Sequence, residues 1–533
     1  MATSTSDRTP DPGASPRPPR SERIAGTALW AGLGVVSTLL GMAAAHLVAA
    51  VTTPSSSPVL AVGSQVIDLT PTPMKEWAIR QFGTADKIIL VGSVVLVVLV
   101  LAGVAGVLAR RRLALGAGLL VALVALAAAA AVVQGSVTEL LPSLVAAVTG
   151  VASLWWLHAK ASATSAAEPG QPGQPREAGT GASRRGVLVA AGALAAAAAV
   201  LGGAGRFITG LRSGNVDIAL PDPASPADPF PQGLEGQVEG ITPLRIDNAD
   251  FYRVDTRLDT PVIDQDSWTL TIDGDVEREI TLTFDDLLEM DLIERDITMT
   301  CVSNSVGGEF VGGARWLGVR LTDLLDMAGV GDTADQIYST DFDGMTISTP
   351  LDLATDGRDA MIAIGMNGEA LPRAHGFPAR MIVPGLYGFI SATKWITRIT
   401  LTTYAEKSAY WTDRDWATDA PIKVSTRIDT PNALEELPVG ENVIGGVAWA
   451  QQKGGVDKVQ VRVDGGAWQD AEMGPSVNND YWRQWFYRWD ASEGGHTVAA
   501  RAISGDGTTQ TPARAMPFPE GASGIQELRV TVT

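Results

Sequence analysis

Long apolar stretches fill the first two fifths of the chain and are absent after it. Four of them cover residues 24–51, 87–109, 113–133 and 140–157, and a weaker, alanine-rich stretch covers residues 186–205. A helix that crosses the hydrocarbon core of a membrane needs about 20 residues, so each stretch is long enough, the fourth only just. The pattern predicts a membrane domain over residues 1–212 with five transmembrane helices.

Basic residues flank these stretches unevenly. Clusters of Arg and Lys lie before the first stretch, between the second and third, and between the fourth and fifth, the last ending in Arg184 and Arg185. Lys and Arg are retained on the cytoplasmic side of a membrane, and five spans put all three clusters on one side. We therefore expect a multi-pass protein of the bacterial cell membrane, with a cytoplasmic amino terminus and an extracytoplasmic second half.

The composition and the hydrophobic pattern of the sequence change after the last apolar stretch. Residues 213–245, rich in Pro, Gly and Asp, predict a tether, as residues 161–182 predict a linker between the fourth and fifth helices. Over residues 246–415, short β-type runs alternate with helical segments such as 283–291 and 321–328, which predicts an α+β domain. Residues 420–533 predict a β-sandwich with strands at 442–451, 458–464, 483–490, 496–503 and 526–532.

The two halves of the chain differ in charge. Residues 1–212 contain 16 Lys and Arg against 9 Asp and Glu, a balance of +7, whereas residues 213–533 contain 24 against 50, a balance of −26. Binding to nucleic acid depends on clustered basic residues that neutralise phosphates, so the acidic half excludes nucleic acid as its partner. Such a surplus of negative charge favours solubility.

One cysteine, Cys301, occurs in 533 residues. A thiol binds metal as the thiolate, although a lone cysteine can equally be a small buried apolar residue. The surrounding motif distinguishes the two roles. It runs Asp296-Ile-Thr-Met-Thr-Cys301 and is followed by Ala314-Arg-Trp-Leu-Gly318.

From Asn248 to the end, the chain resembles the sulfite oxidase family. In addition to the Cys301 motif, the resemblance is carried by Asn248-Ala-Asp-Phe-Tyr-Arg253, Arg373-Ala-His-Gly-Phe-Pro-Ala-Arg380, Val383-Pro-Gly-Leu-Tyr-Gly388, Ser391-Ala-Thr-Lys394, Gly446-Val-Ala-Trp449, Val463-Asp-Gly-Gly466 and Trp482-Arg-Gln-Trp485. It implies a molybdopterin-binding oxidoreductase domain with a molybdenum–molybdopterin cofactor, followed by an immunoglobulin-like dimerisation domain. A homodimer is accordingly expected.

The resemblance also assigns roles to residues. Cys301 would bind molybdenum, and Arg253 would hold an anionic substrate near the metal. The expected cofactor contacts are Asn248, Tyr252, Arg253, Ser339 or its neighbour Thr340, His375, Arg380, Ser391, Thr393 and Lys394. Arg380 and Lys394 have the fixed positive charge that a phosphate group requires.

One position departs from the family pattern. Trp416 stands where sulfite oxidases have a tyrosine in the substrate site, so we expect Trp416 to be a catalytic-site residue. An indole N–H donates a hydrogen bond but cannot accept one. Sulfite is therefore a less certain substrate than the family name implies.

The predicted reaction is two-electron oxygen-atom transfer on a small sulfur oxyanion such as sulfite. Reduction of an S-oxide or N-oxide, similar to the catalytic subunit of the periplasmic methionine sulfoxide reductase, is the enzymatic alternative. A membrane-anchored binding module that has lost its cofactor is the other alternative, and the joint presence of Cys301, Arg380 and Lys394 counts against it.

The electron route must involve another molecule. His46 lies toward the outer end of the first apolar stretch and His158 at the inner end of the fourth, so they do not form a haem-binding pair, and a single cysteine cannot bind an iron–sulfur cluster. We therefore expect no haem or iron–sulfur cluster in this chain. The expected electron partner is a separate electron-transfer protein or a quinone-linked partner, and the apolar helices contact membrane lipid.

The segment Ser183-Arg184-Arg185-Gly186-Val187-Leu188 resembles a twin-arginine export signal. Two arginines before an apolar helix can also be an ordinary cytoplasmic flank. The family inserts molybdopterin in the cytoplasm, which implies that the outer domain crosses the membrane already folded, and this favours the export signal.

Overall fold

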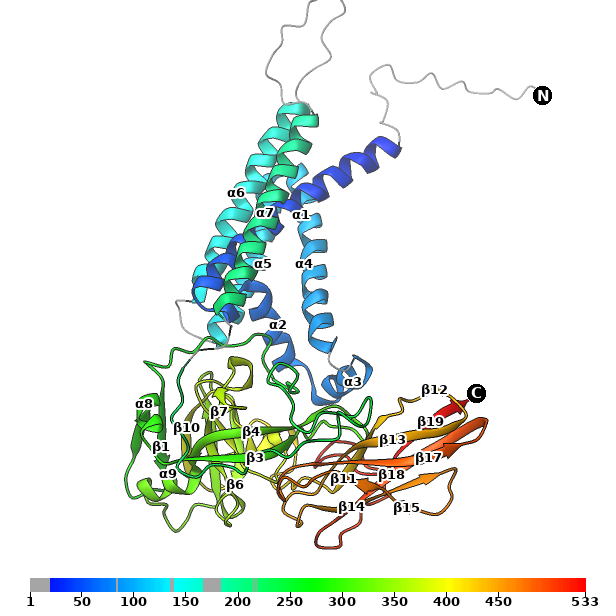
Figure 1. Cartoon of the computed structure of the whole chain (residues 1–533). Coiled ribbons are helices and arrows are strands. Elements are labelled where there is room, and N and C mark those ends of the chain that lie inside the picture. The colour runs from blue at the N-terminus through cyan, green and yellow to red at the C-terminus, as the bar shows by residue number, and fades with distance from the viewer. Residues whose placement is uncertain are drawn as a thin grey trace, which may run out of the picture. The chain divides into compact units, whose positions relative to one another are not determined.

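The computed structural model describes residues 20–82, 85–134, 139–165, 184–212, 214, 216 and 218–533. It forms two compact units, residues 1–212 and 213–533 (Figure 1). Within the described residues, the first unit is helical and the second contains the β-strands. Most of the predicted linker at 161–182, and Ser183 of the arginine motif, lie outside the described residues.

Five long apolar helices make up the first unit. Each contains a stretch of 21 to 28 residues that is apolar enough to cross a membrane, which confirms the predicted five-helix region. Helix α1 packs against α4, α6 and α7. The five helices are α1 (Arg20–Val51), α4 (Asp86–Arg111), α5 (Leu113–Gln134), α6 (Leu140–Ser165) and α7 (Arg184–Arg212).

Shorter elements occupy the segment between the first two long helices. They are the 3-10 turn η1 (Pro54–Ser56) and the helices α2 (Pro58–Leu69) and α3 (Thr72–Phe82). No helix was predicted between residues 51 and 87. At 12 and 11 residues, both helices are too short to span a membrane.

Two glycines let α1 and α4 approach closely. A Cβ atom on Gly34 would lie 2.1 Å from the carbonyl oxygen of Ala102, and one on Gly106 would lie 2.0 Å from the carbonyl oxygen of Trp30. Small residues at such crossings allow the van der Waals contact that drives helix association in membranes. A side chain at either position would force the two helices apart.

The histidines of the membrane unit lie at different depths. His46 packs against α7, where a Cβ atom on Gly205 would lie 2.8 Å from its Cδ2. The ring of His158 lies 5.3 Å from that of Trp30. Trp30 and His46 are sixteen residues apart on α1, or about 24 Å at 1.5 Å per residue, so His46 and His158 are too far apart to bind one haem.

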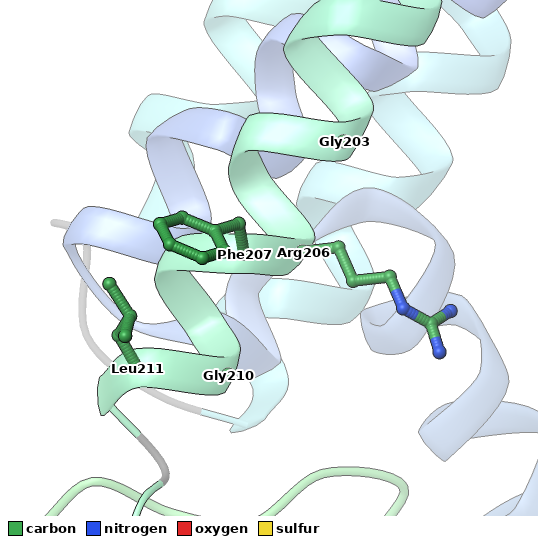
Figure 2. Close-up of a pocket in the computed structure, with 5 residues that line it drawn as sticks. All are labelled: Gly203, Arg206, Phe207, Gly210 and Leu211. Atoms are coloured by element: carbon green, nitrogen blue, oxygen red, sulfur yellow. The ribbon is translucent and has the colours of Figure 1, made fainter.

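The carboxyl-terminal part of α7 carries a shallow hollow of about 420 Å³, lined by Gly203, Arg206, Phe207, Gly210 and Leu211. Figure 2 shows Phe207 and Leu211 on one side of the helix and the Arg206 guanidinium extending from the other. Phe207 and Leu211 are each 67% exposed, as expected for side chains that face lipid.

The second unit begins with an α+β domain that contains two sheets, as the sequence predicted. The first sheet has the order β2 (Ile280–Thr283), β1 (Thr269–Gly274), β10 (Ile396–Thr402), β5 (Gln336–Asp341) and β6 (Thr346–Pro350). The second has the order β3 (Leu292–Thr300), β4 (Val311–Arg320), β7 (Met361–Met366) and β8 (Glu369–Ala370), and β9 (Arg380–Ile382) also pairs with β7.

Short helices join these strands. They are α8 (Phe284–Leu288), α9 (Leu321–Ala328), α10 (Leu351–Ala354) and α11 (Gly388–Ser391), with 3-10 turns η4 (Arg373–His375) and η5 (Thr412–Arg414). A capping box fixes the start of α8, since Thr283 Oγ1 accepts a hydrogen bond from the amide of Asp286 at 3.1 Å and the Asp286 carboxylate accepts one from the amide of Thr283 at 2.7 Å.

A β-sandwich completes the chain, as the sequence also predicted. Its sheets have the orders β11–β13–β17–β16 and β12–β19–β18–β14–β15. The five predicted strands are present with ends within two residues, and one longer strand and three two-residue strands were not predicted. The bounds are β11 (Ser425–Thr430), β12 (Glu436–Leu437), β13 (Gly440–Trp449), β14 (Val456–Val463), β15 (Gln469–Asp470), β16 (Glu472–Met473), β17 (Arg483–Ala491), β18 (Gly494–Ser504) and β19 (Gln526–Val532).

The glycine crossing gives a testable prediction. Gly34→Val should lower the free energy of unfolding in detergent by about 1 to 3 kcal/mol, because the extra atoms overpack the contact between α1 and α4. Gly32→Val is the matched control, since a Cβ atom on Gly32 meets nothing within 4 Å. Thermal unfolding in one detergent compares the two variants, and equal midpoints would contradict the proposed contact.

Candidate active site

The hairpin of β3 and β4 determines the position of Cys301. Thr300 pairs with Val311 at the end of the ladder, and the amide of Cys301 extends it by donating to the carbonyl of Phe310 at 2.9 Å. Asn304 closes the loop, because its amide donates to the carbonyl of Cys301 at 3.0 Å and its Oδ1 accepts from the amide of Phe310 at 3.0 Å. The thiol is therefore held by backbone geometry at the tip of a sheet.

The thiol of Cys301 is buried, with 9% of the residue exposed. Its Sγ accepts a hydrogen bond from the amide of Ser303 at 3.4 Å. Burial raises the pKa of Cys301, and the hydrogen bonds from Ser303 only partly oppose this. A protonated buried thiol is a poor nucleophile, but a bound metal cation would displace its proton and make it a thiolate ligand.

Loops of the β-sandwich hold β3 three residues before Cys301. The amide of Thr298 donates to the carbonyl of Asp480 at 3.0 Å, and the carbonyl of Thr298 accepts from Gln451 Nε2 at 2.9 Å. Its Oγ1 accepts from the amide of Trp482 at 2.8 Å. The hydroxyl and both backbone groups of Thr298 are thus bonded to the sandwich, so the two domains share the framework of the site.

Arg380 supplies a buried positive charge. Its Nη1 donates to the carbonyl of His375 at 3.0 Å, and its guanidinium lies over the ring of Trp316 at 5.2 Å. Its Nε has no hydrogen-bond partner among the described residues. Burial lowers the pKa of Arg380 to about 10. A buried charge is costly unless an anion and hydrogen bonds compensate it, so this guanidinium is suited to an anionic ligand.

Gly376 brings the second cation beside the first. A Cβ atom on Gly376 would lie 3.0 Å from Cβ of Arg380 and 3.2 Å from Cβ of Lys394, and its φ of +120° is a conformation that favours glycine. The ammonium group of Lys394 contacts the carboxylate of Asp255 and the carbonyl of Ala374, the latter at 3.5 Å.

Asp255 joins two of the predicted cofactor-binding cations. Its carboxylate accepts hydrogen bonds from both Arg253 and Lys394, and its side chain is 1% exposed. Arg253 Nη2 also donates to the carbonyl of Asp259 at 3.2 Å. The sequence analysis did not select Asp255, because no motif distinguishes it from its acidic neighbours.

His375 is neutral at physiological pH. Burial lowers its pKa to about 4, with Arg380 and Arg253 acting in the same direction against a hydrogen bond to Asn248. Its Nε2 lies 2.9 Å from the carbonyl oxygen of Asn248, so in the neutral ring Nε2 carries the proton and donates. The Asn248 side chain is bonded within the protein, since its Nδ2 donates to the carbonyl of Met366 at 3.1 Å.

Tyr252 lies close to both the thiol and the buried guanidinium. Burial and then Cys301 raise the pKa of Tyr252, whereas Arg380 acts in the opposite direction. The ring of Tyr252 stacks on that of Phe251 at 5.1 Å and lies 6.4 Å from that of Phe310. Its hydroxyl is therefore neutral, and its ring packs against the hairpin that carries the predicted metal ligand.

The predicted hydroxyl contacts are occupied by protein partners. Ser339 Oγ lies 2.5 Å from Thr393 Oγ1, and Ser391 Oγ donates to the carbonyls of Leu386 and Tyr387, each at 3.0 Å. All three side chains are buried. The bond between Ser339 and Thr393 joins β5 to the segment before β10, while Ser391 bonds to the turn that precedes α11.

Trp416 belongs to an aromatic cluster. Its ring lies 5.5 Å from Phe389, 5.8 Å from Trp411 and 5.3 Å from Phe518, and its Nε1 has no hydrogen-bond partner among the described residues. The cluster adjoins the Cys301 hairpin, because a Cβ atom on Gly388 would lie 3.8 Å from the carbonyl oxygen of Thr300. Trp416 is thus part of a buried aromatic cluster, in which its N–H is an unused donor.

Tyr387 was not selected from the sequence, although it lies within the motif Val383–Gly388. Burial raises its pKa to about 12, and the neighbouring Cys301 and Glu520 act in the same direction against a backbone hydrogen bond from Lys423. It is a second neutral hydroxyl near the thiol.

Part of the second unit is similar to known molybdopterin-binding proteins. Residues 257–411 match the oxidoreductase molybdopterin binding domain. Rat mitochondrial sulfite oxidase is 30% identical over 285 residues, which cover 46% of this chain and 52% of that protein. A tobacco nitrate reductase (NADH) is 28% identical over 284 residues, which cover 41% of this chain and 30% of that protein. The chain spans about half the length of the sulfite oxidases that it matches.

A solved structure, the sulfane dehydrogenase SoxCD from Paracoccus pantotrophus, aligns with a TM-score of 0.48 at 23% identity, covering 56% of this chain and 83% of that one. The sequence matches define the class of protein as a molybdopterin-binding oxidoreductase. This chain carries a molybdopterin domain of the sulfite oxidase family, which confirms the predicted family.

The residues present fit the cofactor that this family implies. The unpartnered Nε of buried Arg380 and the ammonium group of Lys394 would bind a phosphate group. Cys301 would provide a soft sulfur ligand for molybdenum.

The neutrality of His375 predicts how stability depends on pH. Below the ordinary pKa of 6.5, the unfolded chain takes up a proton that the folded protein, with a pKa of about 4, does not. The free energy of unfolding should therefore fall as pH drops from 6.5 to 4, by about 3 kcal/mol at about 1.4 kcal/mol per pKa unit. Unfolding of the parent and of His375→Gln across this range measures the difference, and parallel pH profiles would contradict it.

Proposed function

We propose that this chain is a membrane-anchored oxidoreductase whose outward-facing domain transfers an oxygen atom in a two-electron reaction. The observation that carries the proposal is that the buried Cys301 hairpin and the buried Arg380 guanidinium adjoin the same aromatic cluster. The ring of Tyr252 lies 6.4 Å from that of Phe310, whose carbonyl accepts from the amide of Cys301, and Phe251 connects Tyr252 to Trp316, over which Arg380 lies at 5.2 Å. The bound cofactor would supply the two-electron chemistry. Cys301 would anchor and tune the metal, while Arg380 and Lys394 would fix the phosphate group and so orient the cofactor.

For the substrate, a small sulfur oxyanion such as sulfite is one candidate. It would require Arg253 to offer its charge to an anion. Arg253, however, is bonded to the carboxylate of Asp255 and to the carbonyl of Asp259, so much of that charge is already compensated.

Reduction of an S-oxide or N-oxide is the second candidate, and two contacts favour it. Asp255 compensates Arg253, and the aromatic wall at Trp416 offers an unpartnered N–H to an oxide oxygen. A neutral oxide needs one hydrogen-bond donor and an apolar wall more than it needs a fixed positive charge. A cofactor-free binding module would lack molybdenum altogether, and metal analysis of the purified protein tests that alternative.

Electrons would be exchanged with a separate electron-transfer protein or a quinone. His158 packs against Trp30, which lies about 24 Å from His46 along α1, and this argues against a haem between the two histidines. The membrane unit would then serve to keep the enzyme at the lipid surface where such partners are found. We further propose a cytoplasmic amino terminus and a homodimer formed through the β-sandwich.

The role of Cys301 gives a prediction. Cys301→Ser should remain folded but lose at least about tenfold in turnover at equal molybdenum content, because a hydroxyl is a harder ligand that changes the electronic properties of the metal. Turnover with an artificial electron carrier, measured together with molybdenum content, tests this. Ser305→Ala, an exposed position in the same loop, is the matched control. Activity within about threefold of the parent would contradict the assignment.

The arginine pair gives another prediction. Replacing Arg184 and Arg185 by Lys keeps the charge but should leave the outer domain in the cytoplasm, if a twin-arginine pathway reads the pair itself. Accessibility of a carboxyl-terminal tag to external protease reports the outcome. The same exchange at Arg110 and Arg111, in the last turn of α4, should leave the tag accessible. If the tag is fully accessible in both variants, Arg184 and Arg185 only help to set the orientation of the helix in the membrane and are not an export signal.

A further inference from the structure

A cavity of about 720 Å³ opens between the Cys301 hairpin and the β-sandwich. Its lining comes from residues 240–252, from residues 306–311 of the hairpin and from residues 427–433 and 514–528 of the sandwich. Tyr252 belongs to this lining, as do Glu309 and Val311, which flank the Phe310 carbonyl that accepts a hydrogen bond from the amide of Cys301. The cavity thus extends from solvent to the residues that flank the predicted metal ligand.

Carboxylates outnumber cations along this route. The lining includes Asp250, Glu309, Asp429 and Glu527 but two arginines, Arg427 and Arg514. Arg427 and Asp429 compensate each other's charge within the cavity lining. Arg427 Nε donates to Asp429 Oδ1 at 2.6 Å, and both side chains are less than 10% exposed.

The remaining charges give the opening a negative potential. Asp250 and Glu309 are exposed and form no ion pair within the part of the chain that the structure describes, while Arg514 is the remaining cation of the lining. Arg462 approaches Glu527 at 3.7 Å, but both side chains are substantially exposed, and exposed ion pairs of this kind contribute little. A passage lined by one sign of charge concentrates ligands of the opposite sign and repels those of the same sign.

We infer that the substrate which enters by this cavity is an uncharged or cationic organic S-oxide or N-oxide, and that Glu309 helps to select it against anions. The inference rests on the proposed function and names its substrate class. Consider a sulfoxide as the substrate and a quinol as the electron donor. The sulfur–oxygen bond breaks, and the oxygen leaves as water with two protons from the quinol. Two electrons from the quinol reduce the sulfoxide to a thioether. The quinol is oxidised to a quinone.

Three methyl sulfoxides with the same reacting group test the selection by charge. They are 2-(methylsulfinyl)ethylamine, a cation at neutral pH, uncharged methyl ethyl sulfoxide and the anion (methylsulfinyl)acetate. With the full chain in detergent, its molybdenum content known and a reduced viologen as donor, kcat/KM should be about tenfold or more higher for the cation than for the anion at low ionic strength. High salt should shrink this ratio by screening.

Reversal of one charge assigns the effect to the cavity. Glu309→Lys should lower the ratio of kcat/KM between cation and anion by about five- to tenfold at low salt, with methyl ethyl sulfoxide as the common reference. Glu493→Lys changes an exposed carboxylate outside the cavity and should leave the ratio unchanged. A preference for the anion, or equal ratios in the two variants, would overturn the inference.

Equilibrium binding separates this inference from the proposed function. The sulfones 2-(methylsulfonyl)ethylamine and (methylsulfonyl)acetate have the same charges and serve as binding probes that need no turnover. The amine should bind more tightly, and Glu309→Lys should reverse the order; the opposite result would overturn the inference. If the purified protein contains no molybdenum, the proposed function is wrong. If it oxidises sulfite but reduces none of the sulfoxides, the proposed function stands and the inference is wrong.

Discussion

Buried positive charge is the constraint on which the molybdopterin domain depends. Arg380 and Lys394 flank Gly376, and Lys394 shares the carboxylate of Asp255 with Arg253. Arg380 forms no ion pair among the described residues, and His375 adds no charge because burial keeps its pKa near 4. A phosphate group carries about two negative charges. Since uncompensated buried charge costs several kcal/mol, a phosphate-bearing ligand would compensate the charge of Arg380.

The same interior requires precise support from the sandwich. Thr298 is bonded through both backbone groups and its hydroxyl to residues of the last domain, and the aromatic core that contains Trp316 continues into Tyr481 and Trp482. Strand β3 therefore cannot shift without breaking the contact between the domains. This explains in physical terms why the sandwich forms one compact unit with the domain that binds the cofactor, whatever its role in dimerisation.

The sequence predicted features that depend on local pattern and missed those that depend on distant contacts. Apolar stretches of membrane length and alternating strands identified the architecture, but α2 and α3 are too short to leave such a signal. The motifs found Cys301, Arg380 and Lys394. They could not reveal Asp255, which reaches Lys394 across 139 residues, nor that the hydroxyls of Ser391 and Thr393 are bonded to protein partners.

The acidic balance of residues 213–533 thus has more than one consequence. Averaged over the surface it favours solubility, yet the charges are not distributed evenly. Cations gather around Asp255 and His375, where a phosphate is expected, whereas carboxylates such as Glu309 line the approach to Tyr252. Tyr252 lines the carboxylate-rich cavity, and its raised pKa keeps its hydroxyl neutral. A domain arranged in this way can retain one anion permanently and still discourage a second from entering.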